Sequence, residues 1–397
     1  MITSSGPEQS EVIPALDGIR GIAILLVLAH NTSALDLVPG TFARAMALAC
    51  DAGWIGVQLF FVLSGFLITR VLLRTRDAEN YYRAFFGRRV LRIFPLYYAV
   101  LVIAFVIIPT ASRALGGTVP AIIAADATSQ VWLWTYLSNW ASPFGRGSEA
   151  FPHFWSLAVE EQFYLVWPFV VRRLWSRSSD GRALLAACGA LAVLAFASRL
   201  GLRVATDDPH GPYLFTVCRL DALCLGGAAA VVLASPGLAL WSRQNVRMLR
   251  AGALIAFVLG AMATRAYARM SFAGQTVGYS VLAVAFAVWI LATASAHHQP
   301  RTRARAETML RSRLLRAFGK YSYGIYVFHL PVHVFVGQRI LRALGNGAVG
   351  PTSLALALAY MLGVIGVTFA LAAISYHAFE VRFLRHKLSF VARVPSP

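Results

Sequence analysis

Apolar residues gather in long runs along the chain, and short polar segments separate these runs. The runs are about 17 to 25 residues long, enough for an α-helix to cross a hydrocarbon core about 30 Å thick. The pattern therefore predicts about ten membrane-spanning helices. They cover residues 18–37, 53–73, 93–109, 154–171, 183–200, 213–235, 250–266, 276–294, 321–340 and 353–377.

The composition fits an all-α, polytopic membrane protein. Of the 397 residues, 58% are apolar and only 13% are charged, about half the charged share of globular proteins. We expect one integral-membrane domain over residues 1–397, with a core at about 12–385, a short polar N-terminal tail and a basic C-terminal tail. The first thirteen residues contain no Lys or Arg, so no signal-peptide n-region is expected.

The net charge of +19 first suggests a nucleic-acid partner, but its distribution favours a membrane topology. The polar connections fall into two alternating sets. One set (74–92, 172–182, 236–250, 295–320 and 378–397) contains 24 Lys and Arg residues, and the other contains 6. The positive-inside rule makes the basic set cytoplasmic. With ten spans, both termini are then cytoplasmic, and no nucleic-acid partner is expected.

No metal site or disulfide framework is expected. The four cysteines (Cys50, Cys188, Cys218 and Cys224) lie in or beside apolar runs without paired spacing. His329 and His333 have the i, i+4 spacing of a helical metal pair, but no motif supplies a third ligand.

Several predicted spans carry ionisable residues. The first span contains Asp17, Arg20 and His30, and later spans contain the pairs Glu160–Glu161, Arg219–Asp221 and His329–His333. A charged group at the bilayer centre costs roughly 2.5–3.5 kcal/mol on insertion scales, so such groups usually face a cavity and serve a function. We expect most of them to converge on an interior cavity. Arg219 and Asp221 point to different helix faces, so each needs another partner, and both are interpreted as structural.

Six segments, in this order, resemble the acyltransferase 3 family of membrane acyltransferases. They are "LDGIRGIAILLVLAH", "GVQLFFVLSGFLIT", "FFGRRVLRIFPLYY", "HFWSLAVEEQFYLVWP", "GKYSYGIYVFHLP" and "YHAFEVRF". The resemblance covers residues 12 to 385. It implies transfer of an acyl group, commonly acetyl, from cytoplasmic acyl-CoA to a hydroxyl of a surface polysaccharide, a lipopolysaccharide sugar or a macrolide.

The family signature is an Arg or Lys, ten residues and then a His, but only nine residues separate Arg20 from His30 here. The shorter step leaves the two side chains about 80° apart around the helix. Either His30 works from a rotated face, or a local bulge restores the alignment. Asn31 occupies the position of the family histidine, and we favour His30 because Asn cannot act as a base.

His30 is the predicted general base, because histidine suits proton transfer near neutral pH. It would deprotonate the acceptor hydroxyl, and a covalent acyl-histidine is a variant of this mechanism. Glu160 is the candidate that orients His30, as the resemblance supports. The alternatives are a helix-end histidine bonded to the backbone and a Glu160 that forms an ion pair with an arginine. No role is predicted for Glu161.

Arginines are the predicted donor site. Arg88, Arg89 and Arg92 match the family's Arg-x-x-Arg motif, and Arg forks suit the phosphates of coenzyme A. The alternative is that they are ordinary positive-inside residues. Arg20 either binds a phosphate or pairs with Asp17, one turn earlier. Asp17, Tyr326 and His329 are expected to line the substrate cavity. In "FVLSGF", Ser64 and Gly65 are interpreted as helix-packing residues.

The sequence thus predicts an acyl-CoA-dependent O-acyltransferase of a bacterial plasma membrane, with a carbohydrate or macrolide acceptor. One alternative is a transporter that exports a small molecule or glycolipid through the same cavity. It would show two matched halves with broken helices, and the sequence shows none. A second alternative is a binding or scaffolding membrane protein. The acceptor, the acyl chain length and the oligomeric state are left open.

Overall fold

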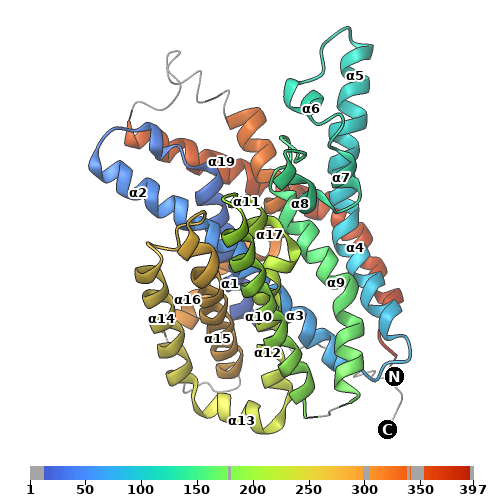
Figure 1. Cartoon of the computed structure of the whole chain (residues 1–397). Coiled ribbons are helices and arrows are strands. Elements are labelled where there is room, and N and C mark those ends of the chain that lie inside the picture. The colour runs from blue at the N-terminus through green and yellow to red at the C-terminus, as the bar shows by residue number, and fades with distance from the viewer. Residues whose placement is uncertain (1–12, 178–179, 298–304, 338–339, 341–352, 394–397) are drawn as a thin grey trace.

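The computed structural model describes residues 13–177, 180–297, 305–337, 340 and 353–393, and these residues form helices without β-strands (Figure 1). The long helices are α1 (Pro14–Thr32), α2 (Thr41–Asp51), α3 (Ile55–Arg74), α4 (Tyr81–Val102), α9 (Phe154–Trp175), α10 (Arg182–Ala205), α12 (Leu220–Ala234), α13 (Pro236–Gln244), α14 (Val246–Ala263), α15 (Tyr279–Ala296), α17 (Arg313–Val332) and α19 (Leu354–Ser375). Short helices include α5 (Ile108–Ala114), α6 (Ala121–Ala125), α7 (Val131–Trp134), α8 (Ser138–Ala141), α11 (His210–Leu214), α16 (Arg305–Leu310) and α20 (Val381–Arg385). The all-α prediction is confirmed.

Within the described residues, eight helical segments are long and apolar enough to cross a membrane. They correspond to eight of the ten predicted spans. The other two predicted spans fall on α9 and α17, whose polar residues lower their apolar character. Both helices pack against other helices of the bundle, α9 against α3 and α17 against α1 and α19. The polytopic architecture is therefore confirmed, while the number ten and the position of the termini stay predictions.

Helix α1 is held by close contacts between backbones. A Cβ atom on Gly319 of α17 would lie 1.9 Å from the carbonyl oxygen of Asp17. Gly18 and Gly21 of α1 likewise leave no room for a side chain, because the carbonyl groups of Leu310 and Leu315 touch them. Small residues at such crossings let helices approach closely in membranes. These contacts fix the position of α1 along α17.

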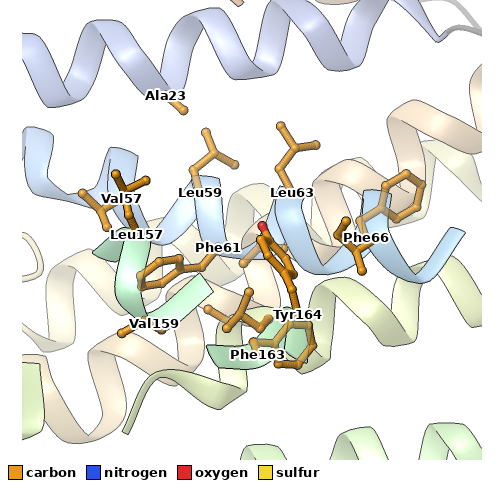
Figure 2. Close-up of a cluster of buried hydrophobic side chains, with 14 of the residues drawn as sticks. Ala23, Val57, Leu59, Phe61, Leu63, Phe66, Leu157, Val159, Phe163 and Tyr164 are labelled. Carbon is orange, nitrogen blue, oxygen red and sulfur yellow. The ribbon is translucent and has the colours of Figure 1, made fainter. Parts of the chain in front are cut away.

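Helix α3 lies between α1, α12 and α9. Figure 2 shows Leu59 and Leu63 of α3 on the side that faces Ala23 of α1, and Phe163 and Tyr164 of α9 on the opposite side of α3. On the α12 side, a Cβ atom added to Gly65 would lie 1.9 Å from the carbonyl oxygen of Leu223. The packing role predicted for Gly65 is therefore confirmed by this contact.

Two buried arginines stabilise the centre of the bundle. Arg199 donates to Asp221 at 2.7 Å, and both side chains are almost completely buried. Arg219 donates to Gln58 at 2.7 Å, and its guanidinium lies 4.5 Å from the ring centre of Tyr279. The expectation that Arg219 and Asp221 find separate partners is confirmed.

Candidate functional site

A cavity of about 380 Å³ lies between α1, α3, α4, α9 and α17. Its charged lining residues are Asp17 and Arg20 from α1, Arg70 and Arg74 from α3, Arg89 and Arg92 from α4, and Glu160 and Glu161 from α9. Tyr326 of α17 and Ser64 of α3 also line it. Five arginines face three carboxylates, so the lining carries a net positive charge. We call this space the basic cavity.

Glu160 interacts with arginines and hydroxyl groups inside the basic cavity. Its carboxylate contacts the hydroxyls of Ser64 and Tyr164, which lie 2.6 Å apart. The guanidinium of Arg89 lies 3.8 Å from the ring centre of Tyr164, and both Arg89 and Arg20 interact electrostatically with Glu160. Among the described residues no ion pair joins Glu160 to an arginine, so the predicted alternative of an ion-paired Glu160 stays a prediction. Ser64 contributes its hydroxyl to the cavity wall, which the packing interpretation did not foresee.

A second, smaller cavity of about 230 Å³ shares Arg20 and Arg92 with the basic cavity. It adds two cations, Lys320 of α17 and Lys387 beyond α20. Arg20 sits where the two cavities meet and donates to Asp17 at 3.1 Å. Pairing with Asp17 and access to an anionic ligand are therefore compatible roles for Arg20.

The three predicted donor arginines do not share one position. Arg89 and Arg92 line the basic cavity. Arg88 is not among the residues that line either cavity, and its Nε donates to the carbonyl oxygen of Ala84 at 3.3 Å. The structure therefore brings Arg89 and Arg92 together with Arg20, and leaves Arg88 beside its own helix.

His30 lies near the other end of α1. Its Nε2 atom is 2.9 Å from Nη1 of Arg269, and its Nδ1 atom is 3.4 Å from a carboxylate oxygen of Asp51. Among the described residues no contact joins His30 to Glu160, so the structure does not bring the expected pair together. The reason is the length of α1: Glu160 lies at the level of Arg20, and ten residues of helix place His30 about 15 Å further along the axis.

The segment that carries Arg269 has an unusual backbone. Arg265, Ala266 and Tyr267 have positive φ angles of 52°, 58° and 57°. Left-handed residues cost roughly 1–2 kcal/mol each, so surrounding contacts must hold them. Trp54 donates its indole N–H to the carbonyl oxygen of Tyr267 at 3.0 Å, and the hydroxyl of Tyr279 donates to that of Arg269 at 2.8 Å. These bonds fix Arg269 over His30.

His329 of α17 and His333, which directly follows α17, lie outside the cavity. His329 is fully buried, its Nδ1 lies 2.6 Å from the carbonyl oxygen of Tyr326, and its ring packs 4.7 Å from that of His153. It therefore backs the cavity wall behind Tyr326 and is not among the lining residues, contrary to expectation. His333 contacts the hydroxyl of Tyr360 at 2.8 Å. In the described part of the chain, no three His, Cys, Asp or Glu residues are arranged to hold a metal ion.

Comparison with known families agrees with the six sequence segments. Residues 13–376 match the acyltransferase 3 family, described as "Acyltransferase domain". The chain belongs to the acyltransferase 3 family. Together with its apolar helices, membership makes this acyltransferase 3 protein a multi-pass protein of the bacterial plasma membrane, as predicted.

Two relatives of this acyltransferase 3 protein illustrate the similarity. It is 32% identical over 385 residues to YrhL of Bacillus subtilis (strain 168), named as a candidate peptidoglycan O-acetyltransferase; the match covers 93% of this chain and 54% of YrhL. It is 28% identical over 330 residues to the peptidoglycan O-acetyltransferase OatA of Listeria monocytogenes, covering 81% of this chain and 49% of OatA. The chain thus spans about half the length of these relatives. No solved structure matches it.

The structure decides how this family member accommodates the short Arg20–His30 spacing. Helix α1 is a regular α-helix from Pro14 to Thr32, so no bulge realigns the two side chains. Asn31 donates its side-chain amide to the carbonyl oxygen of Val27 at 2.9 Å. His30, rather than Asn31, therefore reaches Asp51 and Arg269, and does so from a rotated face.

Sequence reasoning missed Asp51, Arg269, Ser64 and Tyr164 of this acyltransferase 3 protein. Asp51 and Arg269 lie in predicted connections, where polar residues are ordinary, so neither stood out. A weak signal existed for Arg269, because it is the single Lys or Arg in the connection 267–275. Tyr164 lies four residues after Glu160, on the same face of α9.

Proposed function

We propose that this protein is a membrane O-acyltransferase that transfers an acetyl group from acetyl-CoA to a hydroxyl of a carbohydrate. The observation that carries the proposal is the combination, along one helix, of a net positive cavity at Arg20 and a histidine with a fixed tautomer at His30. The printed names of the relatives support acetyl transfer and a peptidoglycan-type acceptor. They favour a carbohydrate over the macrolide acceptors of other family members.

The donor side is the basic cavity. Coenzyme A has a pyrophosphate and a separate ribose phosphate, and planar guanidinium groups bind such oxygens in a bidentate manner. Arg20, Arg89 and Arg92 supply three of these groups around one space. In the proposed mode the phosphates stay among the arginines, and the thioester end of the donor extends along α1 towards His30.

The acceptor side is His30. An Arg N–H can only donate, so Nε2 of His30 accepts from Arg269 and the proton lies on Nδ1, facing Asp51. Nε2 is then the nitrogen without a proton, and it acts as the base once the hydrogen bond from Arg269 opens. It takes the proton of the acceptor hydroxyl as the oxygen attacks the thioester carbonyl carbon. When the tetrahedral intermediate collapses, the C–S bond breaks and the thiolate of coenzyme A takes that proton from His30, which regenerates the base.

In this scheme Asp51 replaces Glu160 as the partner of His30, and Glu160 balances the charges of Arg89 and Arg20. A carboxylate beside Nδ1 fixes the tautomer and stabilises the imidazolium that forms. The Asp51 oxygen lies 3.4 Å from Nδ1 without a hydrogen bond in the resting structure, and 69% of the Asp51 side chain is exposed, so the proposed role needs a small rotation of the carboxylate.

The test uses the full chain in lipid nanodiscs. Acetyl-CoA labelled in the acetyl group is supplied with a soluble peptidoglycan fragment, without an ion gradient. The proposal expects label in an ester on the glycan and stoichiometric release of coenzyme A, both lost in His30→Gln. Accumulation of label inside sealed vesicles without an ester product would instead support the transporter alternative. Binding without either event would support a scaffold.

A further inference from the structure

We propose that Arg269 is a gate over His30: it covers the base nitrogen in the resting protein and leaves it only when the acceptor arrives. The inference rests on the proposed function, in which Nε2 of His30 must reach the acceptor hydroxyl. In the structure that nitrogen is already occupied, because Nη1 of Arg269 lies 2.9 Å from it. A hydroxyl cannot approach Nε2 until this hydrogen bond opens.

The position of Arg269 is built by its surroundings. Its carbonyl oxygen accepts from the Tyr279 hydroxyl at 2.8 Å, and its guanidinium lies 5.4 Å from the ring centre of Tyr213. The backbone just before it is held in the left-handed region by the indole of Trp54. The main chain is therefore fixed, while the long side chain keeps rotatable bonds that let the guanidinium swing away from His30.

A series of aromatic contacts connects the wall of the basic cavity to the ring that supports Arg269. Phe61 lines that cavity, and its ring lies 5.9 Å from the ring of Trp155. Trp155 lies 4.7 Å from Tyr213, the ring that supports Arg269. Packed rings thus link the donor cavity to the place where Arg269 lies over His30.

A covered base has a chemical use. An acyl thioester beside an exposed base is open to attack by water, which would consume the donor without modifying the acceptor. Closing an active site excludes such side reactions. Arg269 in its resting place keeps Nε2 from activating water, and the acceptor supplies the hydroxyl that replaces its hydrogen bond. Arg269 is thus a positioning residue that couples donor consumption to transfer.

The first test measures how well Arg269 protects His30 from chemical modification, and it does not require turnover. Diethyl pyrocarbonate modifies an accessible imidazole nitrogen, and mass spectrometry of peptides reports each histidine separately. In the wild-type chain in nanodiscs, His30 should react at least about tenfold more slowly than His210, whose side chain is 61% exposed. Equal rates for the two histidines would overturn the gate without any variant.

Variants then assign the protection to Arg269. Arg269→Ala should raise the modification rate of His30 about tenfold, while Arg269→Lys, which keeps a donor and a charge, should retain part of the protection. Arg265→Asn is the matched control, since Arg265 is exposed on the same segment and Asn tolerates its positive φ. An unchanged His30 rate in Arg269→Ala, with the His210 rate also unchanged, would contradict the proposal.

The last measurement separates this inference from the proposed function. Without acceptor, Arg269→Ala should hydrolyse acetyl-CoA faster than the wild type, and its ratio of hydrolysis to transfer should rise about tenfold. A wild-type ratio in the variant would overturn the gate and leave the transferase standing. A wild-type protein that neither transfers nor hydrolyses would count against the proposed function, whereas the modification rates would still decide whether Arg269 covers His30.

Discussion

Nε2 of His30 lies 2.9 Å from Nη1 of Arg269, although 239 positions separate the two residues in the sequence. The contact joins the end of the first helix to the segment that precedes α15. It also determines which nitrogen of His30 carries the proton, because guanidinium groups only donate. The proposed chemistry therefore depends on a residue from a connection, while the donor site depends on residues within the helices.

Replacing His30 should abolish most turnover without loss of donor binding. General base catalysis contributes typically 10²- to 10⁴-fold, so kcat of His30→Gln should fall by that factor. Gln keeps hydrogen bonding but cannot take the proton. The measurements are acetyl transfer and equilibrium binding of acetyl-CoA to protein in nanodiscs. A His30→Gln variant with near wild-type kcat would exclude His30 as the base.

Asp51→Asn should weaken the same step less severely. The carboxylate of Asp51 is largely exposed, so water can replace part of its effect, and a fall in kcat of about tenfold is expected. The KM for acetyl-CoA should stay constant. Combining Asp51→Asn with His30→Gln should add little further loss, because both act on one base. Fully additive losses would show that Asp51 acts independently of His30.

The arginines of the basic cavity should act on donor binding. A charged hydrogen bond is worth roughly 1.5–3 kcal/mol, so Arg89→Ala and Arg92→Ala should each raise the KM for acetyl-CoA about tenfold or more. Arg83→Ala is the matched control, because Arg83 is exposed on the same helix. If all three variants had the same KM, the cavity arginines would serve topology rather than donor binding.

The crossing of α1 and α17 offers a test of stability. Gly319→Ala places a Cβ atom 1.9 Å from the Asp17 carbonyl oxygen, and such overpacking costs typically about 1–3 kcal/mol. The melting temperature in detergent should fall. Gly366→Ala in α19 meets nothing within 4 Å and should leave it unchanged. Equal melting temperatures for both variants would show that α1 is free to shift along α17.

The predicted topology can be tested by cysteine labelling in a variant that lacks the four native cysteines. A cysteine at position 177, in a basic connection, should be protected from an impermeant reagent added to intact cells. A cysteine at position 207, in an opposite connection, should be labelled. The reverse pattern would invert the assignment made from the 24 and 6 basic residues.

The fold followed from the sequence wherever hydrophobicity decides the structure. A long apolar run such as 353–377 must form a helix in a membrane, because only a helix satisfies its backbone hydrogen bonds there. Each predicted span falls largely on a described helix. The cavity was foreseeable in part, because ionisable residues in spans are costly in lipid and tend to turn inward. Of the nine ionisable residues for which this was expected, four line the basic cavity, namely Asp17, Arg20, Glu160 and Glu161. The expectation that most of them converge there is therefore wrong.

The partners of His30 could not be predicted, and the reason is geometric. Helix spacing relates residues within one helix, but Asp51 and Arg269 reach His30 from a helix end and a connection whose paths depend on tertiary contacts. The prediction chose Glu160 because it lies in a span and matches a motif. The sequence gives the axial distance of about 15 Å between Arg20 and His30. It does not give the position of Glu160 along α1, because that depends on how α9 packs in the bundle.

The glycine contacts that fix α1 also fix a length. Because α1 is regular throughout and its glycine contacts hold it in place against α17, the axial distance between Arg20 and His30 is fixed at about 15 Å. A donor whose phosphates bind at Arg20 can present its thioester at His30 only if the chain between the phosphates and the thioester is long enough to span this distance. The fixed distance therefore selects the length of the carrier chain and not the size of the acyl group. Donor analogues with a shortened carrier chain should bind well and react poorly.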